Sequence, residues 1–187
     1  MPQGSILGPI LFLIYINDLP NISQLFHPVL FADDTTLTLN GTEITDLIHS
    51  CNTELQMFKR WSDSNRLSIS VEKSHCVLVT NRNVPADLND LMLNDNSLNF
   101  LNQCVFLGVT FDKNLRYNEH IESICKKVSK SIGIMYRLRS YVPLQTLKTL
   151  YNALIYPYLS YCIVIWGGTY FSHLKPLIIL QKKLFAS

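Results

Sequence analysis

Two adjacent aspartates, Asp33 and Asp34, stand between two short β-prone segments and limit the folds that are open to this chain. Residues 27–32 are mostly apolar and residues 35–39 are threonine and leucine, a pattern that predicts a hairpin turning at the carboxylates. Neighbouring side chains of a regular strand point to opposite faces, whereas a tight turn can aim both at one place. Two carboxylates this close repel each other unless a cation lies between them, and Mg²⁺ prefers such oxygen ligands. An ordinary polar turn is the alternative, because aspartate is common in turns.

Charge is divided unevenly along the 187 residues, although the formal net charge is only +2. Residues 1–60 hold two basic and six acidic side chains, whereas residues 113–187 hold eleven basic and two acidic ones. An acidic first part suits a bound metal and a basic last part suits a polyanion. The alternative for the basic part is a solvated helical surface.

The five cysteines are odd in number, widely spaced and without a CxxC pair. We therefore expect reduced thiols in an intracellular protein, rather than a zinc site or a disulfide scaffold. No basic region precedes the first apolar run, as it would in a signal peptide. Residues 150–168 are apolar enough to mimic a membrane span, but Asn152, Pro157 and five tyrosine or tryptophan residues interrupt them, so we expect no membrane contact.

Apolar periodicity predicts a mixture of helices and strands. We expect a buried helix over residues 5–19 with Ser5 as its N-cap, and amphipathic helices at 43–65, after residue 116, at 143–156 and at 172–185. Strands are expected at 27–32, 35–39, 67–70, 76–80, 91–93, 98–100 and 105–111. Gly108 inside the last strand indicates a bulge or a close approach of the backbone to another group.

Three motifs follow one another near the start of the chain. Residues 2–9 read PQGSILGP, the apolar run after them ends in INDLP at residues 16–20, and residues 31–34 read FADD. In this order and spacing they resemble the reverse transcriptases of non-LTR (LINE-type, jockey-like) retrotransposons. The resemblance continues to the last residues, through Tyr156-Pro157, Tyr161, Trp166-Gly167-Gly168 and Gln181-Lys182. It implies an α+β fold, with a partial polymerase palm (an antiparallel sheet with helices) over residues 1–112 and a helical thumb-like region over residues 113–187.

The resemblance also implies a reaction, two-metal nucleotidyl transfer, and roles for individual residues. Asp33 is the implied shared metal ligand and Asp34 its neighbour, with Mg²⁺, or Mn²⁺ in its place, as the metal. Lys73 resembles the lysine that approaches the leaving pyrophosphate as a general acid, although Ser70 replaces the family's usual asparagine; a solvated turn lysine is the alternative. Gln3 and Gly4 are implied to lie beside the incoming nucleotide and the template.

The later part of the chain resembles the elements that hold nucleic acid. Phe106, Leu107 and Gly108 resemble a primer grip, with a plain core strand as the alternative. We interpret Tyr161 and Trp166 as core residues rather than as base-stacking platforms. Phosphate contacts from the thumb-like helices would give affinity for an RNA–DNA hybrid without reading its sequence. The expected nucleic-acid-binding residues are Lys126, Lys127, Lys130, Arg137 and Arg139.

One part of the family's catalytic site has no counterpart here. A third aspartate lies, in the family, on a strand before the PQG motif, whereas Met1 already stands inside that motif. We therefore expect a fragment that lacks the fingers, the first catalytic strand and an endonuclease domain, and that does not polymerise alone. The parent enzyme would use an RNA template, a DNA primer and dNTPs, in the cytoplasm and nucleus. The alternative is a non-catalytic nucleic-acid-binding remnant or a domesticated fragment.

Overall fold

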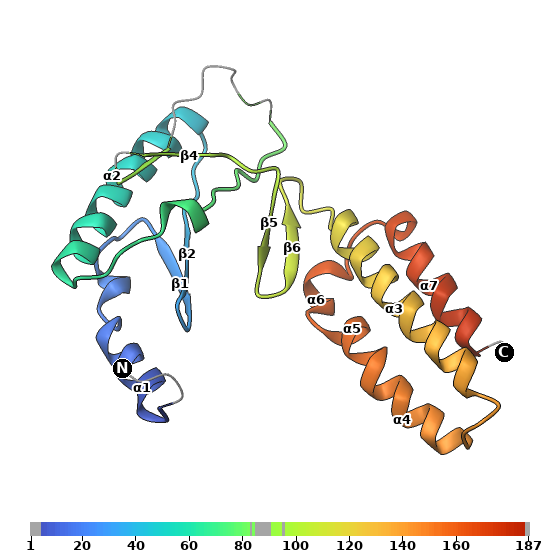
Figure 1. The fold of residues 1–187 in the computed structure, drawn as a ribbon. Helices are drawn as coiled ribbons and strands as arrows, with labels where there is room; N and C mark the ends of the chain where they lie inside the picture. The colour runs from blue at the N-terminus through green and yellow to red at the C-terminus, as the bar shows by residue number, and fades with distance from the viewer. Residues whose placement is uncertain (1–4, 83, 85–90, 95, 186–187) are drawn as a thin grey trace. The chain divides into compact units, whose positions relative to one another are not determined.

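A computed structural model describes residues 5–82, 84, 91–94 and 96–185 of the chain. The chain divides into two compact units. The first unit comprises Met1–Cys76 and Arg82–Phe100, and the second comprises Val77–Asn81 and Leu101–Ser187. Helices and short antiparallel strands occur in both (Figure 1), so the α+β prediction is confirmed.

The first unit has its core between one long helix and a short hairpin. Its elements are α1 (Leu7–Tyr15), the 3-10 helix η1 (Leu19–Asn21), β1 (His27–Phe31), β2 (Asp34–Thr38), α2 (Ile44–Ser64), the 3-10 helix η2 (Val71–Lys73), β3 (Leu91–Leu93) and β4 (Asn96–Leu98). The apolar stripe of α2 buries Ile48 and Leu55 against Leu91, Leu93 and Leu98. The predicted amphipathic helix at 43–65 is thereby confirmed, with Asn65 as its C-cap.

The first helix differs from its prediction. It covers Leu7–Tyr15 instead of residues 5–19, its N-cap is Ile6 rather than Ser5, and no residue of it is buried. Ile6 is 88% exposed. The sequence is apolar on all sides of this helix, but the core of the unit is closed by α2, β3 and β4. A hydrogen bond from the Tyr15 hydroxyl to the Asn65 carbonyl ties α1 to the end of α2.

The strands form three separate two-stranded antiparallel sheets, β1–β2, β3–β4 and β5–β6. The strands predicted at 67–70 and 76–80 are not formed, and this region has only an isolated parallel bridge between Cys76 and Phe100. A strand needs a partner for its backbone N–H and C=O groups. Within the described residues neither segment has a neighbouring strand. β4 begins at Asn96, two residues before the predicted strand, and pairs directly with Leu93.

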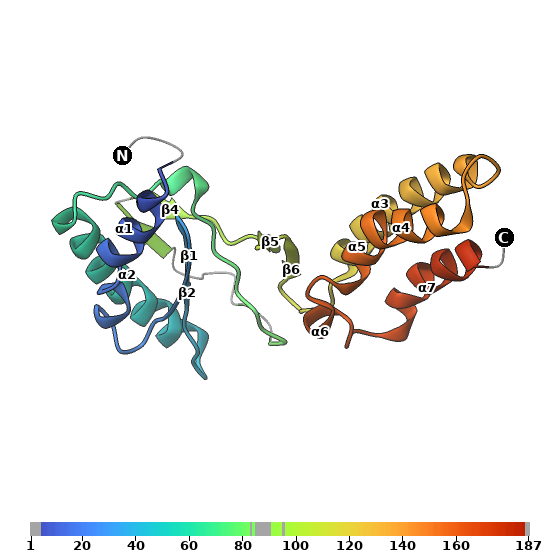
Figure 2. The same cartoon turned by 90° about the horizontal axis from the view of Figure 1, so that it is seen from below.

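The second unit is built around one central helix. Its elements are β5 (Gln103–Phe106), β6 (Val109–Asp112), α3 (Asn118–Leu138), α4 (Leu144–Leu154), α5 (Tyr156–Ser160), α6 (Ile163–Trp166) and α7 (Phe171–Phe185). α3 packs against α4, α5, α7 and β6, and in Figure 1 it lies between α4 and α7. Figure 2 gives the view from below, in which α3 and α4 overlap. Val128 in the middle of α3 is 0% exposed, and Trp166 is 1% exposed in the same core.

The strand predicted at 105–111 is instead a hairpin, β5–β6, in which Phe106 pairs with Val109. Leu107 and Gly108 form its turn and both have left-handed backbones, with φ of 45° and 80°. Such φ values are those of two-residue hairpin turns, so Gly108 supplies a turn rather than a bulge. This hairpin belongs to the second compact unit, whereas the division into a palm over 1–112 and a thumb over 113–187 stays a prediction.

All five cysteines are free thiols, as predicted. Residues 150–168 are distributed over the end of α4, α5 and α6. Among the described residues, no helix combines the length and apolar character that crossing a membrane requires.

Candidate functional site

The Asp33-Asp34 pair lies at a hairpin turn, as predicted. Phe31 pairs with Asp34, which leaves Ala32 and Asp33 as the two turn residues. Ala32 has a left-handed backbone with φ 51°, and Asp34 is the first residue of β2. Both aspartates are exposed. Two exposed aspartates that are adjacent in sequence therefore lie at the end of a two-stranded ribbon, where a ligand can reach them.

The strands that carry this turn follow from their side chains. Val29 lies opposite Thr36, and Leu30 lies opposite Thr35, so β-branched residues occupy three of these four paired positions. At the far end of the ribbon the Thr38 hydroxyl donates a hydrogen bond to the His27 carbonyl at 3.0 Å. These contacts fix the register, and the register decides which two residues form the turn.

The chemistry of the pair fits part of a divalent-metal site. Carboxylate oxygens are ligands of Mg²⁺, and neither Asp33 nor Asp34 forms an ion pair with a described residue. Within the described part of the chain, no group of three His, Cys, Asp or Glu side chains could hold a metal ion. Asp112 is engaged elsewhere, because its carboxylate accepts backbone hydrogen bonds from Asn114, Arg116 and Tyr117. The pair could offer two carboxylate ligands, and the metal-binding role of Asp33 and Asp34 stays a prediction.

Lys73 is the last residue of η2 and is exposed. The loop that presents it is closed by Ser70, whose carbonyl accepts the Lys73 N–H at 3.2 Å and the Ser74 hydroxyl at 2.8 Å. The Lys73 ammonium has no ion pair with a described residue. Its role as a general acid stays a prediction. Gln3 and Gly4, predicted to lie beside the nucleotide and template, are outside the described residues.

The β5–β6 hairpin carries the residues predicted as a primer grip. The carbonyl of Leu107 accepts a hydrogen bond from the Tyr161 hydroxyl at 2.6 Å. A Cβ at Gly108 would lie 3.6 Å from Cε1 of the same tyrosine, so the ring also packs on the turn. Tyr161 is 53% exposed, and its interpretation as a core residue was wrong; for Trp166 that interpretation is confirmed. Sequence spacing gave no signal for the contact between the Tyr161 hydroxyl and Leu107.

The second strand of the same hairpin is attached to the helices through His120. Nδ1 of this buried residue accepts the Thr110 N–H at 3.3 Å, and its ring meets Trp166 edge-on, with centroids 5.8 Å apart. Burial, and then the positive charge of Lys127, lower the pKa of His120 below its ordinary value. The imidazole is therefore neutral near pH 7, which it must be to accept the Thr110 N–H at Nδ1.

The predicted nucleic-acid-binding side chains are all exposed: four lie on α3, and Arg139 is the C-cap residue that follows it. The Lys127 ammonium lies 5.4 Å from the centre of the Tyr158 ring, and the Arg139 guanidinium lies 5.5 Å from that of Tyr136. A cation over an aromatic face keeps its charge. Positive charge is therefore presented along α3 by Lys126, Lys127, Lys130 and Arg137, and at its C-cap by Arg139.

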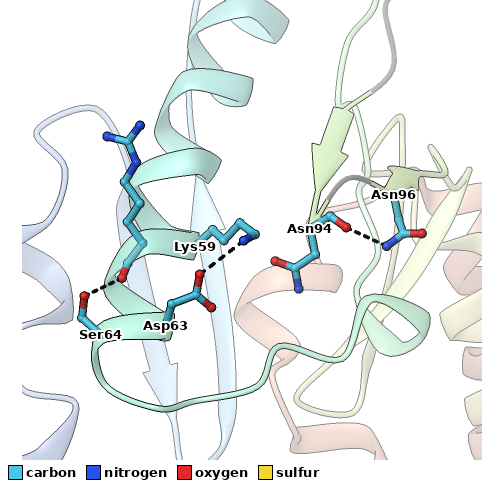
Figure 3. A network of polar contacts seen from close by, with 6 residues as sticks. Lys59, Asp63, Ser64, Asn94 and Asn96 are labelled. Atoms are coloured by element: carbon cyan, nitrogen blue, oxygen red, sulfur yellow. Dashed lines mark hydrogen bonds and ion pairs between the residues drawn. The ribbon is translucent and has the colours of Figure 1, made fainter.

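A hollow of about 350 Å³ in the first unit contains none of the predicted site residues. It lies between the end of α2 and the β3–β4 turn, and Figure 3 shows the polar side chains around it. Lys59 and Asp63 form an ion pair there at 3.2 Å, and the Asn94 carbonyl accepts a hydrogen bond from the Asn96 amide at 2.8 Å. Since the charges of Lys59 and Asp63 neutralise each other, the hollow has no free charge from this pair with which to hold a ligand.

Comparisons with known proteins agree with the motifs. The family model described as reverse transcriptase (RNA-dependent DNA polymerase) matches residues 1–111. The chain is 29% identical over 194 residues to the RNA-directed DNA polymerase from mobile element jockey of Drosophila funebris. It is 28% identical over 192 residues to the probable RNA-directed DNA polymerase from transposon X-element of Drosophila melanogaster. Each match covers 98% of the chain, which spans 21% of each relative's length. No solved structure matches the chain.

Proposed function

This chain belongs to the reverse transcriptase family, and we propose that it supplies the catalytic hairpin and the nucleic-acid-holding helices of an RNA-directed DNA polymerase from a non-LTR mobile element. The observation that carries the proposal is the position of Asp33 and Asp34. Both are exposed at the end of a hairpin, without an ion pair to a described residue. An ordinary polar turn would also be exposed, and the match of the reverse transcriptase family model to residues 1–111 favours the metal-binding role instead.

The proposed roles follow from chemistry that the residues can perform. Asp33 and Asp34 would hold a divalent metal, Mg²⁺ or Mn²⁺, which when bound neutralises charge on the reacting phosphates. Lys73, exposed and positively charged, would donate a proton or hydrogen bond to the leaving pyrophosphate. Gln3 and Gly4 would lie beside the incoming nucleotide and the template strand.

The second unit would hold the nucleic acid. The turn at Phe106, Leu107 and Gly108 would contact the primer end. The cations on α3 would contact phosphates of the RNA–DNA hybrid, which supports affinity without reading the base sequence. The partners of the whole polypeptide would be an RNA template, a DNA primer and dNTPs.

The chain alone is proposed to be inactive. Two carboxylates without a third leave a metal pair short of a bridging ligand, and removing one member of a catalytic set costs several powers of ten in rate. The whole polypeptide would supply that third carboxylate from a segment outside the described residues, together with fingers and an endonuclease domain.

Primer extension on an RNA template with Mg²⁺ tests the proposal. The samples are the 187-residue chain, the chain extended by the coding sequence upstream of Met1, and the extended chain carrying Asp33→Asn. Asp46→Asn in the extended chain is the matched control, because Asp46 is also exposed but lies in the first turn of α2. We expect extension only from the unmodified extended chain and from the Asp46→Asn control.

Two other outcomes would contradict the proposal. Extension by the 187-residue chain would show that the argument about the missing ligand is wrong. Silence of every sample would indicate a decayed remnant, and binding of an RNA–DNA hybrid would then be the function left to measure.

A further inference from the structure

The turn predicted to grip the primer has an unfavourable backbone conformation for one of its residues. Leu107 has φ 45°, a left-handed value that is unfavourable for a residue with a Cβ. Strained conformations of this kind persist when surrounding contacts fix them, and they concentrate at functional sites. A neighbouring group is therefore expected to hold this turn in its conformation.

Tyr161 provides that contact in two ways. Its hydroxyl donates a 2.6 Å hydrogen bond to the Leu107 carbonyl, and its ring lies against the position a Cβ of Gly108 would take. Local desolvation, and then the neighbouring Cys162 thiol, raise the pKa of Tyr161 above its ordinary value of 10.0. The hydroxyl therefore stays protonated, as a donor, at the pH of a polymerase reaction.

The backbone of Tyr161 is itself fixed from both sides. Its N–H donates to the Pro157 carbonyl at 3.0 Å, and its carbonyl accepts the Trp166 indole N–H at 2.8 Å. Trp166 is 1% exposed and packs among the helices of the second unit. The tyrosine thus joins an exposed turn to the buried core of the unit.

We propose that Tyr161 is a positioning residue that fixes the Leu107-Gly108 turn and, through it, the primer end. The inference rests on the proposed function, because it assumes that this turn contacts the primer. Without the hydroxyl, the turn would sample positions that hold the primer end less well. If the contribution of one hydrogen bond is lost from primer binding, the KM for the primer rises about three- to tenfold.

The first measurement uses the 187-residue chain and the ¹³C shift of the Leu107 carbonyl. Tyr161→Phe keeps the ring and removes only the hydroxyl. Tyr141→Phe is the matched control, because Tyr141 is 83% exposed and its hydroxyl has no hydrogen bond to a described residue. We expect the Leu107 carbonyl shift to change in Tyr161→Phe alone. An unchanged shift would overturn the contact on which the inference depends.

The second measurement uses the extended chain in primer extension. We expect Tyr161→Phe to raise the KM for the primer end about three- to tenfold, with kcat per folded molecule within about twofold of the unmodified chain. A residue that only stabilised the fold would lower the active fraction and leave KM unchanged. An unchanged KM, in an enzyme that Asp33→Asn inactivates, would overturn the positioning role and leave the proposed function standing. If the unmodified extended chain is inactive, both the proposed function and the primer role of the turn are refuted. The Leu107 carbonyl shift would still show whether the Tyr161 hydroxyl contacts the turn.

Discussion

Replacing Asp112 should destabilise the second unit more than any other single change to an acidic side chain of that unit. Its carboxylate accepts the N–H groups of Asn114 at 3.0 Å, Arg116 at 2.9 Å and Tyr117 at 2.6 Å. These bonds close the turn between β6 and the N-terminus of α3. Tyr117, the N-cap of α3, has a left-handed backbone with φ 58°, so the turn needs such support.

The expected cost follows from the three bonds. At about 1 kcal/mol net for each, Asp112→Ala lowers the free energy of unfolding of this unit by about 3 kcal/mol. Asp112→Asn keeps one acceptor oxygen without the charge and should lose about half of that. Glu122→Ala is the control, because Glu122 is exposed on α3, and it should change stability by less than about 0.5 kcal/mol.

The dependence on pH has a definite sign. Partial burial alone would raise the pKa of Asp112, but the hydrogen bonds from Arg116, Tyr117 and Asn114 lower it below its ordinary value of 3.8. A carboxyl with a lowered pKa in the folded state stabilises that state above its ordinary pKa, and the stabilisation is lost as the pH falls through the lowered value. The unmodified chain and Asp112→Ala should therefore converge in stability at strongly acidic pH.

Urea unfolding followed by tryptophan fluorescence measures this effect. Trp61 lies in the first unit and Trp166 in the second, so a Trp61→Phe background leaves Trp166 as the only fluorescent reporter of the second unit. An Asp112→Ala chain within about 0.5 kcal/mol of the unmodified one at pH 7 would refute the reasoning, since effects this small are ordinary for surface positions.

Three further predictions concern the same unit. Val128→Ala should cost about 2–3 kcal/mol in urea unfolding because this side chain is 0% exposed, and a loss below about 0.5 kcal/mol would contradict the assigned core. Burial, and then Lys127, lower the pKa of His120, so its contribution to stability should be fully present above about pH 6.5 and be lost as the pH falls through the lowered pKa. His120→Asn should remove this pH dependence of the free energy of unfolding. The same pH dependence in both chains would contradict the prediction. Replacing Lys126, Lys130 and Arg137 with alanine should weaken binding of an RNA–DNA hybrid. In a filter-binding titration, the slope of log binding constant against log salt concentration should become shallower by about 2–3. An unchanged slope would exclude these phosphate contacts.

Periodicity in the sequence predicted the two long helices because their burial is one-sided. Ile48 and Leu55 on α2 and Ile121 and Val128 on α3 recur at helical spacing and are buried. The hairpin at Asp33-Asp34 was predictable for a similar reason, since two β-prone runs flank a polar pair. The catalytic role of the pair came from its resemblance to a family, not from the pattern itself.

Other features depend on contacts that spacing does not encode. The apolar residues of α1 predicted burial, but a pattern cannot state whether another segment covers the helix. The apolar run at 105–111 predicted one strand, whereas Leu107 adopts a left-handed turn that Tyr161 contacts from 54 positions away in the sequence. Tertiary contacts of this kind override local preference.

The rate of single-nucleotide addition by the extended chain, with and without Asp33→Asn, tests the central claim most directly. The assay uses an RNA template, a DNA primer, one dNTP and Mg²⁺. If Asp33 is a catalytic metal ligand, the substitution lowers the rate about 10³-fold or more while binding of the primer–template stays within a few-fold. A rate within about tenfold of the unmodified chain would show that the hairpin at Asp33-Asp34 is not the catalytic centre.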